Sequence, residues 1–215
     1  LLLWMALQTG GATSRETDRY LQQYLKLLER LHSSETGLAG FIDRPRSVSV
    51  LALVHLAGLP DDQITEDAVR LTPFRGLTDR SIFTKLLPPG HRSALFISAS
   101  PLNRDFRTAG HEVHFFYLKT DADEAVVRVE IPIWVAQDPE LLNRVHAGIL
   151  QDCQTTGGFP YTLVRAHELA VIPAQERTAF EDMLQRTLLG HGLRPTQSQK
   201  ALTKQLTGQR KHHRL

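Results

Sequence analysis

The chain has 215 residues, of which 41% are hydrophobic and 22% are charged, a composition typical of one large globular domain. Its single cysteine, Cys153, excludes an internal disulfide and favours a reducing compartment, with the cytoplasm as the default. The apolar run at Leu1–Leu7 is too short for a signal peptide or a membrane span, so we expect no membrane association.

The formal net charge of +2 conceals an asymmetry along the chain. Residues 194–215 hold six lysines and arginines and no acid, which leaves 19 basic against 23 acidic groups in residues 1–193. A basic tail beside a mildly acidic body suits contact with phosphates or with an acidic partner surface, although a merely solvated tail explains it equally well. We therefore divide the chain into a domain at 1–193 and a basic tail at 194–215.

Strand and helix patterns alternate along the first half of the chain. The predicted strands are Leu1–Leu7 and Gly37–Ile42. The first predicted helix is capped by Thr13 and Glu16 and ends near Ser33. The second predicted helix is capped by Ser47 or Ser49 and ends at Gly58. A third, short helix is predicted over Leu77–Leu86. Residues 60–75 are expected to be irregular.

The second half predicts an antiparallel pair of strands followed by helices. The predicted strands are Ser93–Ser98, His111–Lys119 and Ala125–Ile131, with a polar loop over Pro101–Gly110. In the last strand Val127, Val129 and Ile131 face one side, and Arg128 and Glu130 face the other. Asp138 begins one helix and Pro173 another, whose inward residues are Phe180, Met183, Leu184 and Leu188. These elements predict an α/β or mixed-sheet layered domain.

A charged segment, Asp43-Arg44-Pro45-Arg46, follows the second predicted strand. Ligands gather at the carboxyl ends of strands in α/β sheets, and guanidinium groups bind phosphate oxygens in pairs. The segment therefore suits a phosphate site. A loop in which Asp43 pairs with Arg46 is an equally good interpretation.

The stretch Gly157–Ile172 concentrates chemically active side chains in an otherwise apolar sequence. Helical spacing would turn Leu163 and Ala166 toward the core and leave His167 and Glu168 at the edge of the buried stripe. Together with Asp43 they would suit Mg²⁺ or Mn²⁺, although His167 could instead be a core-edge histidine bonded to a backbone carbonyl. The ten histidines do not otherwise cluster in ligand spacing, apart from His212-His213, and Cys153 is expected to be a buried, inert thiol.

Several stretches, taken in order, resemble the NurA family of DNA-end-processing nucleases. They are Ala39–Ser47, Leu77–Phe83, Pro89–Phe96, Phe115–Leu118, Glu130–Ala136, Phe159–Ile172 with its AHELAVI segment, and Ser198–Lys204. The resemblance implies an RNase H-like domain with a mixed sheet flanked by helices. It also implies a Mn²⁺-dependent (alternatively Mg²⁺-dependent) nuclease that acts on single- and double-stranded DNA ends in double-strand-break repair. A hexameric HerA-type helicase is the implied partner, and a homodimer is the implied state.

The resemblance also assigns roles to individual residues. His167 matches the family's histidine at the metal or the scissile phosphate, and Phe159 stands where the family usually has a tyrosine, with Tyr161 two positions on. Asp43 matches none of the family's metal-binding acids and is only a weak catalytic candidate. We expect Arg44 and Arg46 to contact the DNA backbone, and Lys200 and Lys204 to contact phosphates or the helicase.

The family's metal-binding acids come from two segments that would precede Leu1. We therefore expect the chain to be an N-terminally truncated, C-terminal portion of a NurA-like protein that does not hydrolyse DNA alone. The alternative is a non-catalytic module that binds DNA or the helicase.

Overall fold

The computed structural model describes residues 14–65, 67–68, 73–74, 76–121, 125–171 and 174–192. They fall into two compact units, divided between Val164 and Arg165. The predicted strand Leu1–Leu7, the cap Thr13, the lysines Lys200 and Lys204, and the boundary of the basic tail lie outside the described residues. None of the described helices is long and apolar enough to cross a membrane.

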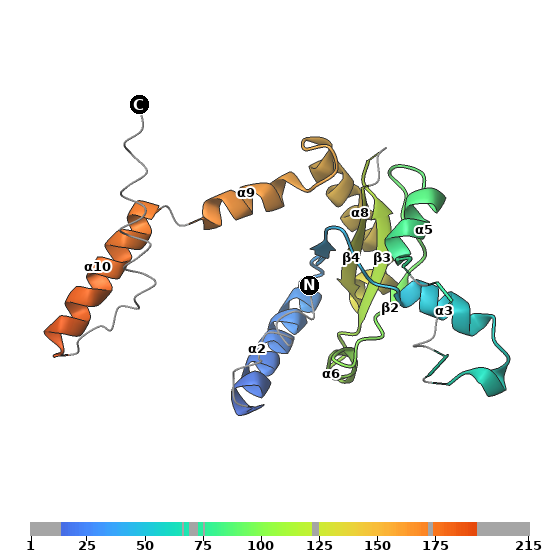
Figure 1. Cartoon of the computed structure of the whole chain (residues 1–215), viewed down its shortest axis with the longest axis horizontal. Helices are drawn as coiled ribbons and strands as arrows, with labels where there is room; N and C mark the ends of the chain where they lie inside the picture. Colours follow the sequence, from blue (N-terminus) through green and yellow to red (C-terminus); the bar gives the residue numbers. More distant parts are fainter. Residues whose placement is uncertain are drawn as a thin grey trace. The chain divides into compact units, whose positions relative to one another are not determined.

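The first unit is built on a sheet of four strands in the order β1-β4-β3-β2 (Figure 1). These strands are β1 (Gly40–Ile42), β2 (Phe96–Ile97), β3 (Val113–Lys119) and β4 (Val126–Pro132). The β3–β4 hairpin confirms the antiparallel pair predicted from the sequence. β1 and β2 also pair antiparallel to their neighbours. The described fold is therefore α/β with an antiparallel sheet.

The parallel strand pairs of the predicted mixed sheet are not found among these four strands. The sequence pattern suggested them because helices intervene between strands. However, β1 pairs with β4 and β2 pairs with β3. The segment between β1 and β2 is long enough to allow either a parallel or an antiparallel orientation of these strands.

One face of the sheet is covered by α2 (Ser14–Ser33), α8 (Pro139–Gln154) and the short helix α7 (Ile133–Gln137). Leu25, Leu28 and Leu142 of α2 and α8 pack there in one cluster with Val129 and Ile131 of β4. This confirms the alternation predicted for β4 and the helix predicted to end near Ser33. The predicted start of α8 is also confirmed, because the carboxylate of Asp138 accepts hydrogen bonds from the N–H groups of Glu140 and Leu141.

The opposite face is covered by α3 (Ser49–Ala57) and α5 (Asp79–Leu86). Phe83 of α5 stacks on Tyr117 of β3 with 4.6 Å between ring centroids. Because these helices cover the sheet, Arg128 and Glu130 of β4 are buried, with 3.1 Å between Nη2 and Oε1. The guanidinium carbon of Arg128 lies 3.7 Å from the centroid of the Phe115 ring, and this cation–π contact stabilises the buried positive charge.

The N-terminus of α3 is capped from a distant part of the chain. The backbone N–H groups of Val50 and Leu51 donate to the carboxylate of Asp79 at 3.1 and 2.9 Å. The hydroxyl groups of Ser47 and Tyr117 also donate to it, at 3.1 and 2.8 Å. The predicted capping by Ser47 or Ser49 is therefore wrong, because α3 has no side-chain cap of its own and a carboxylate from α5 satisfies its free N–H groups.

The segment predicted as a polar loop over Pro101–Gly110 contains a short helix, α6 (Asn103–Thr108). Its single aromatic residue, Phe106, is 1% exposed and joins the core cluster of α2 and α8. The amide of Asn103 bonds to the backbone of Ser98 and Val113, which fixes α6 beside β3. The buried ring of Phe106 and the amide of Asn103 thus stabilise a helix in a segment whose composition is otherwise polar.

The other described elements are a 3-10 turn, η1 (Asp61–Gln63), and two helices, α9 (Tyr161–Ala170) and α10 (Ala174–Gly190). The unit boundary falls within α9, and α10 belongs to the second unit. Helix formation is as predicted, but the predicted burial is wrong. Leu163, Phe180, Met183 and Leu184 are all more than 40% exposed, and α9 has no buried residue.

Candidate functional site

The end of β1 meets the loop between α8 and α9 at a small cavity of about 310 Å³. We call this cavity the arginine pocket. It is lined by Asp43, Arg44, Arg80, Ala125, Val126, Thr156, Gly157, Gly158 and Phe159. Two sequence candidates, Asp43 and Arg44, thus come together with the loop that leads into the AHELAVI segment.

Arg44 has an unusual backbone conformation in this pocket. Its φ is 47°, in the left-handed region that costs a residue with a side chain about 1 kcal/mol or more. Its Nε lies 3.9 Å from Oδ2 of Asp43, and both side chains are more than half exposed, so this ion pair contributes little to stability. The strained backbone and the solvated charge fit a residue that is held for a ligand.

Arg46 is exposed and is not among the residues that line the arginine pocket. The alternative pairing of Asp43 with Arg46 is not the one formed, because Asp43 lies beside Arg44. The structure therefore separates the two arginines that the sequence placed together.

The loop that forms the other wall of the pocket is held by close packing. Gly157 and Gly158 have φ values of 70° and 120°, which favour glycine. A Cβ on Gly158 would lie 3.3 Å from the Cβ of Ala125, and the Gly158 carbonyl accepts a hydrogen bond of 2.7 Å from the Thr120 hydroxyl. The wall is therefore preformed before any ligand binds.

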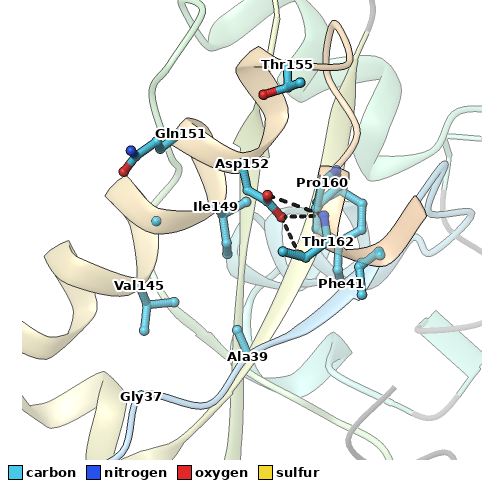
Figure 2. Close-up of a pocket in the computed structure, with 12 residues that line it drawn as sticks. Gly37, Ala39, Phe41, Val145, Ile149, Gln151, Asp152, Thr155, Pro160 and Thr162 are labelled. Carbon is cyan, nitrogen blue, oxygen red and sulfur yellow. Dashed lines mark hydrogen bonds between the residues drawn. The ribbon is translucent and has the colours of Figure 1, made fainter. Parts of the chain in front are cut away.

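A larger cavity of about 670 Å³ lies beside this loop (Figure 2). Its walls come from β1 and the chain before it, from α8 and from the start of α9, and they include Gly37, Ala39, Phe41 and Ile149. Phe41 packs edge-to-face on Phe159 with 5.4 Å between centroids, so this aromatic pair connects the larger cavity to the arginine pocket.

Asp152 fixes the start of α9 at the larger cavity, as Figure 2 shows. Its two carboxylate oxygens accept the backbone N–H of Thr162 at 3.3 and 3.1 Å, and one also accepts the Thr162 hydroxyl. This is a capping interaction at the positive end of a helix. It ties the start of α9 to α8.

His167 lies on the part of α9 that belongs to the second unit and is exposed. The neighbouring Glu168 pairs with Arg165 one turn earlier on the same helix. Since α9 buries no residue, the interpretation of His167 as a histidine at the edge of a buried stripe finds no support. Cys153 is buried as predicted, and burial raises the pKa of its thiol to about 11, so it is a poor nucleophile.

Sequence reasoning missed two sets of residues. Arg80 and Thr156 line the arginine pocket, and no sequence motif connects them to it. Glu29, His32 and His111 offer donor atoms that all lie within 4.8 Å of one another. The i, i+3 spacing of Glu29 and His32 on α2 could have indicated a shared face, but nothing in the sequence pointed to His111.

The fold and the site define an α/β domain whose preformed, arginine-lined pocket suits an anionic ligand such as phosphate. The family model described as NurA domain matches residues 9–172. The chain belongs to the NurA family, a family of metal-dependent nucleases, as the resemblance indicated. No curated protein and no solved structure matches the chain significantly. The matched range contains β1, the arginine pocket and His167, whereas Ser198–Lys204 lies beyond it.

Proposed function

We propose that the protein serves in DNA double-strand-break repair as a NurA-type nuclease that hydrolyses phosphodiesters at DNA ends. The match of the NurA domain over residues 9–172 carries this proposal. Under this proposal, the domain is RNase H-like, acts in the cytoplasm on single- and double-stranded DNA ends, and uses Mn²⁺ or Mg²⁺. The arginine pocket supports the substrate class, because guanidinium groups bind phosphate oxygens bidentately.

The proposed roles follow from the chemistry of the side chains. Arg44 and Arg80 bind backbone phosphates in the pocket, and Arg46 binds a phosphate outside it. His167 acts at the catalytic metal or at the scissile phosphate, with Asp43 assisting. The two lysines of the tail, Lys200 and Lys204, contact DNA or the helicase.

Catalysis needs more carboxylates than the pocket contains. Asp43 is the one acid among the residues that line it. Two-metal hydrolysis holds its ions about 4 Å apart with several oxygen ligands, which the single aspartate of the pocket does not supply. We therefore propose that the pocket binds and positions DNA, and that hydrolysis requires further acids outside the described residues.

The phosphate assignment predicts a specific salt dependence. Binding of the chain to a duplex end should weaken steeply with salt, because each neutralised phosphate contributes about −0.9 to the slope of log K against log salt. Arg44→Gln should make this slope shallower by about 1. Fluorescence anisotropy with a labelled duplex at several salt concentrations measures both.

Arg144→Gln is the matched control, because Arg144 is exposed on α8 and does not line the pocket. It should leave the slope within error of the parent chain. A flat salt dependence of the parent, or equal slopes for the two variants, would remove the phosphate role of Arg44.

A second candidate function, a non-catalytic module that binds the HerA-type helicase, is favoured by the surface of α10. Phe180, Met183 and Leu184 share one face of this helix and are 56%, 56% and 43% exposed. An apolar helix face that stays open to solvent suits insertion into a groove of a partner.

Met183→Glu should weaken binding to a HerA-type helicase at least about tenfold, the effect of burying an unpaired charge. Gln175→Glu adds the same charge at another exposed position of α10 and should have little effect. Sedimentation with the purified helicase measures the affinity. Self-association lost in Met183→Glu, with helicase binding intact, would assign the face to a homodimer instead.

A further inference from the structure

Three side chains with metal-ligating atoms, two on α2 and one from a distant part of the chain, meet between α2 and the loop before β3. They are Glu29 and His32 of α2 and His111, and their donor atoms all lie within 4.8 Å of one another. We propose that they form a site for Zn²⁺ or a similar late first-row transition ion. This site shares no residue with the arginine pocket and is independent of the proposed nuclease function.

The distances suit such an ion. Nε2 of His111 lies 3.2 Å from Oε2 of Glu29. Two ligands that are each about 2.0–2.1 Å from a tetrahedral ion lie about 3.3 Å apart, so this pair already has the spacing of a bound metal. His32 follows Glu29 by three positions on α2, which places both on one face of the helix.

The two histidine rings are held by Trp134. His32 stacks on its indole with 5.1 Å between centroids, and His111 packs edge-on at 5.5 Å. The indole N–H donates a 3.1 Å hydrogen bond to the carbonyl of Thr36, which fixes the indole itself. The two imidazoles are therefore positioned before an ion arrives, which lowers the cost of binding it.

His111 is the buried member of the cluster. It is 2% exposed, and its Nε2, the atom nearest Glu29, is the one that would ligate the ion. Its Nδ1 has no hydrogen-bond partner within the described part of the chain.

The site is accessible from one side. Glu29 and His111 line a cavity of about 520 Å³ whose wall also contains Asp18, Lys26 and Asp105. The cavity provides an entry path and room for water or a carboxylate as the fourth ligand. Two imidazoles with one carboxylate are a ligand set of zinc, whereas Mg²⁺ and Ca²⁺ prefer oxygen ligands alone.

The test uses the 215-residue chain with His212→Gln and His213→Gln, so that the tail offers no competing histidine pair. Isothermal titration with Zn²⁺ should give one site per chain, and Zn²⁺ but not Mg²⁺ should raise the melting temperature by a few degrees. Co²⁺ in place of Zn²⁺ should give visible absorption bands of a tetrahedral ion.

Glu29→Gln and His32→Gln should each weaken Zn²⁺ binding at least about tenfold and abolish the thermal shift. Both positions are exposed, so folding should survive, and circular dichroism checks it. Glu140→Gln and His91→Gln, also exposed, are the controls and should bind as the parent does. Absence of stoichiometric binding to the parent, or unchanged binding to both ligand variants, would show that Glu29 and His111 form only an ion pair.

Discussion

The Asp79→Ala variant is expected to lose about 3–5 kcal/mol of unfolding free energy, because each buried donor left without an acceptor costs about 1–3 kcal/mol and Asp79 serves several donors. Asp79 is 1% exposed. Its carboxylate accepts from the N–H groups of Val50 and Leu51 and from the hydroxyl groups of Ser47 and Tyr117. Alanine would leave these donors, some of them buried, without their acceptor. Urea denaturation followed by circular dichroism measures the loss.

The same network explains why asparagine should be only a partial replacement at this position. Burial raises the pKa of Tyr117, which keeps its phenol protonated and able to donate. An amide accepts hydrogen bonds through one oxygen only and carries hydrogen atoms on its nitrogen. The unfolding free energy of Asp79→Asn should therefore lie between those of the parent and of Asp79→Ala. Asp61→Ala, at an exposed position of η1, should change stability by no more than about 0.5 kcal/mol. A loss below about 1 kcal/mol in Asp79→Ala would mean that water replaces the carboxylate.

Under the proposed nuclease function, His167→Ala is expected to reduce Mn²⁺-dependent DNA cleavage by about 10²–10⁴-fold, the usual contribution of a proton-transfer group. Stability should hardly change, because His167 is exposed on α9. A surface substitution alters unfolding free energy by about 0.5 kcal/mol, which moves the melting temperature by only a few degrees. A fluorescent end-labelled duplex and a thermal melt provide the two measurements.

His191→Ala is the matched control for this prediction, because His191 is another exposed histidine of the second unit and lies outside the AHELAVI segment. It should retain full cleavage. Equal activity of the two variants would argue against a catalytic role for His167. A large drop in melting temperature for His167→Ala would assign it a structural role instead.

Elements with strong local signals were predictable from the sequence. The cap-and-proline pair Asp138-Pro139 begins α8 as expected, and the alternation of β4 indicated which of its residues face α2 and α8. The cap of α3 was not predictable, because Asp79 lies 29 positions beyond Val50 and only the folded chain brings them together. A local search for serine or aspartate before the helix therefore chose the wrong residues.

The candidate sites show the same limit. Asp43 and Arg44 are neighbours in sequence and could be proposed together, but their approach to the Gly157–Phe159 loop depends on long-range packing such as that of Phe41 on Phe159. Spacing rules for metal ligands compare nearby positions. Such rules could not associate His111 with Glu29 and His32, because those two residues lie before β1 and His111 lies far beyond it in the sequence.

The described sheet ends in very short strands, three residues in β1 on one edge and two in β2 on the other. Each edge therefore presents few free backbone donors and acceptors, and Pro45 closely follows β1. Such edges are poor templates for strand-by-strand assembly with a second molecule. The described part of the chain should consequently recognise other macromolecules through side chains and not through the backbone of the sheet edges. A side-chain substitution should therefore be able to abolish one association without disturbing another.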